Sequence, residues 1–119
     1  EMLAANVGLS RVHVHRKLKE LTNLSARDFI KNIRLQQAAA LLKEKGCDLV
    51  VCLSHLGIQM DRELVAKTRN IDVILGGHSH TFMKGPENYQ NVDGKEVPVM
   101  HTGKSGVRVG RLNLTLKRK

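Results

Sequence analysis

Residues 71–81 read Ile-Asp-Val-Ile-Leu-Gly-Gly-His-Ser-His-Thr, and this stretch decides how the second part of the chain folds. Its apolar, β-branched run stops at two glycines, which predicts a buried strand that ends in a tight turn. His78 and His80 follow at once, and Gly76 and Gly77 carry no Cβ atoms that would keep the backbone away from a cation. Neutral imidazole is a common ligand of zinc and similar ions. The stretch alone leaves two interpretations open, because the rings either bind a metal ion or cap a turn and face water.

A second apolar run of strand length covers residues 48–54, and a histidine, His55, also follows it. The residues between the two runs have the apolar spacing of a helix, with Asp61 as the expected N-cap. Strand, helix and strand in this order predict a βαβ unit, whose parallel strands end at the edge where open α/β sheets place ligands. We therefore expect His55, His78 and His80 to meet there as metal ligands.

The C-terminal third is expected to complete the sheet. Asp93-Gly94 is typical of a tight hairpin, residues 96–101 are predicted to form a strand, and residues 107–116 alternate as an amphipathic strand does. His101 ends its predicted strand and is interpreted as a structural residue, outside the ligand set. The cysteines Cys47 and Cys52 are predicted to be reduced core residues, because an interval of five places them on opposite faces of one strand.

The first 45 residues have the apolar periodicity of three helices with clear capping signals. Ser10 is the predicted N-cap of the second helix, Asn23 ends it in a left-handed conformation, and Ser25 caps a long third helix that extends to Lys45. We expect the second helix to bury Val14, Leu18 and Leu21. Its exposed face is basic and is the candidate DNA-binding surface, formed by Arg11, Val12, His13, His15, Arg16 and Lys19.

Length and charge limit the functions open to the chain. The 119 residues suffice for one ordinary domain or two small subdomains, and Lys plus Arg number 20 against 11 acidic residues, which favours a polyanionic partner. The only aromatic side chains are Phe29, Phe82 and Tyr89, so base stacking is excluded as a main mode of binding. No stretch reaches transmembrane length and no signal peptide is recognisable, so we predict a cytoplasmic protein without a membrane partner.

Three segments carry a resemblance to a known enzyme family. They are Val-Val-Cys-Leu-Ser-His-Leu-Gly at 50–57, the quoted 71–81 stretch with Asn70 before it, and Thr-Gly-Lys-Ser-Gly-Val-Arg-Val-Gly-Arg-Leu at 102–112. With them, residues 46–116 resemble the second half of the catalytic domain of calcineurin-like metallophosphoesterases, in the version found in 5'-nucleotidases. The resemblance implies that His55 and His78 bind one metal ion of a dinuclear site and His80 the other. The family's site also needs an Asp-x-His, a bridging Asp and an Asn-His-Asp/Glu, and none of these occurs here.

A different resemblance covers the N-terminal part. Residues 4–18 read Ala-Ala-Asn-Val-Gly-Leu-Ser-Arg-Val-His-Val-His-Arg-Lys-Leu, and residues 4–42 resemble the first helix-turn-helix of AraC-type transcription regulators with its connecting helix. The family's leading helix and its second helix-turn-helix are missing. The resemblance implies base-edge contacts from Val12, His15 and Arg16, and phosphate or groove-rim contacts from Arg11, His13 and Lys19.

Together these patterns predict an α/β protein in which helix-turn-helix-like helices, residues 1–45, precede a βαβ unit and β-hairpin, residues 46–119, as half of a metallophosphoesterase sandwich. Our leading hypothesis is a recombined or engineered chimera without a complete activity. The alternatives are a sequence-tolerant DNA-binding module and a metal-dependent phosphoesterase. We expect weak DNA binding, at most one divalent transition metal ion (zinc, nickel or manganese), no hydrolysis by this chain alone, and a homodimer that covers the open sheet.

Overall fold

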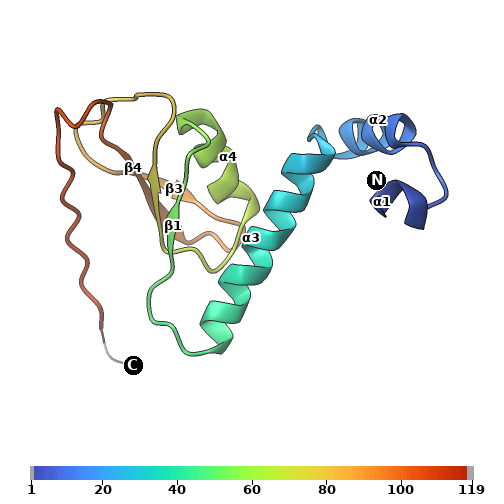
Figure 1. The fold of residues 1–119 in the computed structure, drawn as a ribbon. Helices are drawn as coiled ribbons and strands as arrows, with labels where there is room; N and C mark the ends of the chain where they lie inside the picture. The colour runs from blue at the N-terminus through green and yellow to red at the C-terminus, as the bar shows by residue number, and fades with distance from the viewer. Residues whose placement is uncertain (1, 118–119) are drawn as a thin grey trace. The chain divides into compact units, whose positions relative to one another are not determined.

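The computed structural model describes residues 2–117, apart from the side chain of Leu3. Along the chain, Figure 1 shows α1 (Met2–Asn6), α2 (Arg11–Thr22), α3 (Ala26–Glu44), β1 (Val51–Leu53), α4 (Ile58–Lys67), β2 (Val73–Gly76), β3 (Glu87–Gln90) and β4 (Glu96–His101). The described chain divides into two compact units within α3, where one unit ends at Gln37 and the other begins at Ala38.

The N-terminal unit has the predicted helix boundaries. Ser10 caps α2, its side chain accepting a hydrogen bond from the His13 N–H at 3.2 Å, and Asn23 ends the helix with a φ of 57°. Ser25 accepts from the Asp28 N–H at 3.1 Å and so caps α3. The prediction that Leu21 is buried is wrong, since it is 83% exposed and Val14 is the buried residue of α2. Helices joined by short turns occur in many folds, so the helix-turn-helix assignment stays a prediction.

The C-terminal unit contains a four-stranded mixed sheet in the order β1-β2-β4-β3. β1 and β4 both pair with β2 in parallel, and β3 pairs with β4 in the antiparallel sense. The parallel unit β1-α4-β2 and the hairpin between β3 and β4 are therefore confirmed. In the hairpin turn, the Gly94 N–H donates to the Asn91 carbonyl at 3.0 Å and Gly94 has a φ of 73°, which glycine adopts without strain.

The core of this unit lies between α4 and the sheet. α4 packs against β2, β3 and β4, and Val65, Ile74, Val97 and Val99 are at most 1% exposed. Burial of such an aliphatic side chain contributes about 1.5–3 kcal/mol. The core is therefore built mainly from β-branched aliphatic side chains, in a chain that has few aromatic residues.

The sequence predicted Asp61 as the N-cap of α4, and this prediction is wrong. The helix begins at Ile58 after Gly57, whose φ of 88° lets the chain turn sharply into it, and the Gly57 carbonyl accepts the Asp61 N–H at 3.0 Å. Asp61 therefore lies inside the first turn, where its side chain is completely buried. This correction matters for the site, because a buried carboxylate needs specific partners.

The C-terminal end of α3 is held to the sheet by an ion pair. Lys43 Nζ lies 2.7 Å from Asp72 Oδ2, and Ala39 is 2% exposed. Leu41 and Leu42, in the last turns of α3, are 56% and 44% exposed. The small side chain of Ala39 fills the helix's buried position instead.

Residues 107–116 do not form the predicted strand. They carry no regular secondary structure, and Val109 is 95% exposed, because the segment pairs with no strand in the described chain. Cys47 and Cys52 are free, as predicted, but both are half-buried and do not lie in the core. Within residues 2–117, no helix is long and apolar enough to cross a membrane.

Candidate metal site

Two of the predicted ligands meet at the carboxyl ends of neighbouring parallel strands. His55 follows β1 and His78 follows β2, and their ring centroids are 5.1 Å apart with the planes at 71°. The loops that carry them are hydrogen-bonded to each other, since the Gly57 N–H donates to the Gly77 carbonyl at 3.0 Å. Both imidazoles are exposed, so an ion from solvent reaches them. The parallel order thus places His55 and His78 as the sequence predicted.

Glycine allows this close approach. A Cβ atom at Gly77 would lie 3.2 Å from Nδ1 of His55, so the His55 ring rests against the bare backbone of the second loop. A Cβ atom at Gly57 would lie 3.7 Å from Cδ2 of His78. Gly77 thus lets one imidazole lie against the loop that bears the other, whereas the sequence predicted that it admits a cation.

His80 does not join the other two imidazoles in a metal-binding cluster. Among the described residues, no group of three His, Cys, Asp or Glu side chains is placed to hold a metal ion. The chain turns through left-handed residues at His78 and His80, with φ of 81° and 53°. Ser79 between them accepts the Ile58 N–H at 3.0 Å, which anchors the turn to α4. The structure therefore brings together two of the three predicted ligands, His55 and His78, and their role as metal ligands stays a prediction.

The pair provides two imidazole nitrogens, which are ligands of the type that zinc and nickel prefer. Two imidazoles occupy part of the coordination sphere of such an ion and leave positions for water, substrate or further ligands. The non-glycine residues at positive φ, His78 among them, are of the kind that concentrates at functional sites. The donor set thus fits a divalent transition metal and is incomplete by itself.

A buried polar cluster adjoins the loops that carry the histidine pair, since its member Ser54 directly precedes His55. His101 Nε2 is 2.7 Å from Asp61 Oδ2, and these side chains are 1% and 0% exposed. Ser54 Oγ donates to the other carboxylate oxygen, Asp61 Oδ1, in a short hydrogen bond. The space for the contact comes from Gly76, where a Cβ atom would lie 2.1 Å from Asp61 Oδ2 and 2.2 Å from His101 Nε2.

Sequence reasoning placed His101 correctly as structural but missed its partners. The sequence pattern instead predicts a helix cap at Asp61 and the end of a strand at Ser54. The feature that brings these partners together is the pairing of Gly76 with His101. This pairing depends on the register of the folded sheet, so the sequence alone does not indicate it.

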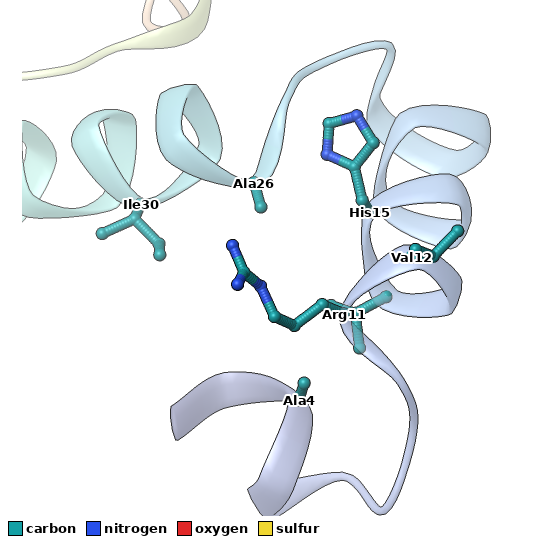
Figure 2. Close-up of a pocket in the computed structure, with 7 residues that line it drawn as sticks. Ala4, Arg11, Val12, His15, Ala26 and Ile30 are labelled. Atoms are coloured by element: carbon teal, nitrogen blue, oxygen red, sulfur yellow. The ribbon is translucent and has the colours of Figure 1, made fainter. Parts of the chain in front are cut away.

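The candidate DNA-binding residues divide into two sets. Arg11, Val12 and His15 line a cavity of about 570 Å³ in the N-terminal unit, together with Ala4, Val14, Ala26 and Ile30. Figure 2 shows the Arg11 guanidinium reaching into the space between Ala4 and Ala26. Val12 is nevertheless 79% exposed, and His13 is half-buried. Arg16 and Lys19 are exposed and lie outside the lining, and Arg16 is 3.9 Å from Glu20.

Comparisons with known proteins bear on the C-terminal unit. No protein-family model matches the chain. Protein 5NUC of Lutzomyia longipalpis is 33% identical over 94 residues, which cover 76% of this chain and 16% of that protein. The 5'-nucleotidase of Homo sapiens is 32% identical over 106 residues, covering 78% of this chain and 18% of its own length. Part of this chain is homologous to 5'-nucleotidases.

A solved structure supports the same relationship. The 5'-nucleotidase precursor from Thermus thermophilus superposes with a TM-score of 0.57 and 33% identity, over 59% of this chain and 16% of that one. The chain therefore spans about a sixth of the length of Protein 5NUC, of the human 5'-nucleotidase and of this solved structure. The mixed α/β fold and the phosphoesterase resemblance of the C-terminal unit are confirmed in this coarse form.

The relatives favour the phosphoesterase alternative over our leading hypothesis. Residues 46–119 make up less than two thirds of the 119 residues, whereas the alignment with the human enzyme covers 78% of the chain. The homologous region therefore extends upstream of Gly46. These relatives give no support to the transcription-regulator resemblance or to a chimera.

Proposed function

We propose that the C-terminal unit is part of a metal-dependent phosphoesterase that acts on nucleotides. The observation that carries the proposal is the pair of imidazoles, His55 and His78, with ring centroids 5.1 Å apart at the carboxyl edge of two parallel strands. The pair lies in a segment homologous to proteins named 5'-nucleotidase.

The chain's own contribution is to bind and orient one divalent transition metal ion. A bound ion of this kind polarises a phosphoryl oxygen and lowers the pKa of a bound water. His55 and His78 would each supply one nitrogen, and both rings are exposed to solvent. Asp61 is buried against His101 and so is not free to act as a ligand.

Hydrolysis requires carboxylate groups that this sequence does not place at the pair. In-line attack with two metals needs the ions roughly 4 Å apart, so that the attacking and leaving oxygens are both stabilised. The 119 residues contain no Asp-x-His and no Asn-His. We therefore expect metal binding from this chain alone and no turnover of nucleoside monophosphates above a metal-only blank.

Calorimetric titration with Mn²⁺, Zn²⁺ and Ni²⁺ tests the proposal. We expect one ion per chain with a dissociation constant on the order of micromolar, equivalent to about −8 kcal/mol. His55→Ala and His78→Ala should each weaken binding at least about 10-fold. The matched control is His15→Ala, because His13 and His15 have the same spacing as His78 and His80 but lie on a helix, where residues two apart face different ways.

Two results would overturn the proposal. One is binding that His15→Ala weakens as much as His78→Ala does, which would indicate adventitious imidazole binding. The other is the absence of any saturable binding by the unmodified chain.

A further inference from the structure

The buried cluster of Ser54, Asp61 and His101 joins the elements that carry the histidine pair. Ser54 directly follows β1, Asp61 lies in the first turn of α4, and His101 is the last residue of β4. Asp61 uses both carboxylate oxygens, Oδ1 for the Ser54 hydroxyl and Oδ2 for His101 Nε2 at 2.7 Å. One side chain thus ties together the ends of two strands and a helix.

The cluster also fixes the end of β2. Gly76 is paired with His101 in the sheet, and the Asp61 and His101 atoms occupy the space where its Cβ would be. Ser54 is further held by its own N–H, which donates to the Leu75 carbonyl at 2.9 Å. The residues immediately beyond these fixed points are His55 on one loop and Gly77-His78 on the other.

We propose that Asp61 and His101 are positioning residues that set the separation of His55 and His78 and thereby the affinity for metal. Neither touches the ion, and both act through the backbone, at Ser54 on one loop and at Gly76 on the other. This inference rests on the proposed function, since it concerns the same ion. Outer partners of metal ligands typically change metal affinity by about 10–100-fold when they are replaced.

The composition of the cluster favours a role in geometry over one in stability alone. Buried hydrogen-bonded polar groups stabilise a fold little better than apolar side chains of the same shape, since replacing both partners by such side chains is nearly neutral. This cluster additionally leaves His101 Nδ1 buried without a hydrogen-bond partner in the described part of the chain. What the polar groups add is direction, because a carboxylate bonded on both oxygens holds Ser54 and His101 at fixed distances.

Asp72, a second hydrogen-bonded aspartate, lies at the start of β2 and serves as the matched control for Asp61. Asp72 immediately precedes β2 and is bound by Lys43 Nζ at 2.7 Å, Lys95 Nζ at 2.6 Å and the Val50 N–H at 2.8 Å. It holds the unit together but lies at the start of β2, at the opposite end of that strand from the carboxyl edge. Asp72→Asn therefore reports what the loss of a well-bonded aspartate does to stability alone.

The test makes three measurements on each of four variants: the affinity for Co²⁺, the visible absorption spectrum of bound Co²⁺, and the urea midpoint of unfolding. Asp61→Asn should raise the dissociation constant about 10-fold and change the Co²⁺ spectrum. Asp72→Asn should lower the unfolding midpoint and leave the dissociation constant within about 2-fold of the unmodified value, because it acts only on stability. His101→Gln, whose amide nitrogen can still donate to Asp61, should retain tighter binding than His101→Ala.

The inference is overturned if Asp61→Asn leaves Co²⁺ affinity unchanged, or if the two aspartate variants weaken it equally. If the unmodified chain binds no Co²⁺, the proposed function fails. The imidazole NMR resonances of the metal-free protein then test whether Asp61 positions His55 and His78. Shifts of the His55 and His78 resonances in Asp61→Asn but not in Asp72→Asn would support positioning, and unchanged resonances would refute it.

Discussion

Replacing Gly76 by alanine tests the buried cluster most severely. The new Cβ would lie 2.1 Å from Asp61 Oδ2 and 2.2 Å from His101 Nε2, so these two groups must separate. Neither has an exposed direction in which to move, since Asp61 is 0% and His101 2% exposed. Leaving each of the two buried groups without its hydrogen-bond partner costs about 1–3 kcal/mol, and overpacking adds about 1–3 kcal/mol. We expect Gly76→Ala to destabilise the C-terminal unit by at least about 3 kcal/mol.

Urea unfolding and thermal melting followed by circular dichroism measure this loss. For a domain of this size each kcal/mol corresponds to about 4–8 °C, so the melting temperature should fall by at least about 12 °C. The control is Gly85→Ala, where a Cβ would meet nothing within 4 Å and the backbone has no left-handed φ. A loss below about 1 kcal/mol in Gly76→Ala, or one equal to that in Gly85→Ala, would refute the close packing of Asp61 and His101 around Gly76.

Three further outcomes are expected. Burial raises the pKa of Asp72, but hydrogen bonds from Lys43 and Lys95 outweigh it, so the pKa lies below its ordinary value of 3.8. The stability it contributes is present above that value and is lost as the pH falls further, so acid unfolding curves of Asp72→Asn should be flatter in this range. Because Leu53 is 81% exposed on an open sheet, we propose a homodimer, which light scattering should detect and Leu53→Lys should dissociate. We also propose weak, salt-sensitive DNA binding, which Arg16→Glu should reduce in mobility shifts on random duplex; full binding by that variant would exclude α2 as the contact surface.

The sequence predicted those parts of the fold that depend on local pattern. Ser10, Asn23 and Ser25 mark helix ends through hydrogen bonds within a few residues, and the apolar run before Gly76 marks β2. The pairing of β1 with β2 followed from the preference of βαβ units, and it placed His55 beside His78. These signals need no knowledge of distant contacts.

The remainder depended on contacts between residues far apart in the chain. Asp61 and His101 are 40 residues apart, and only the parallel pairing of β2 with β4 brings them together over Gly76. Residues 107–116 alternate as a strand does but find no partner in the described chain, so pattern without pairing misled the prediction. His80 was expected at the metal because of its spacing, whereas the left-handed turn at residues 78–80 decides where the ring goes.

The most direct test is whether His55 and His78 bind the same ion. Substoichiometric Zn²⁺, a diamagnetic ion, added to protein with ¹⁵N-labelled histidine shifts the ¹⁵N resonance of each imidazole nitrogen that coordinates it. We predict that His55 and His78 shift together, at the same ratio of ion to chain, while the resonances of His13 and His15 stay unchanged. A shift of His55 without His78, or of His13 as large as that of His78, would contradict a shared metal site.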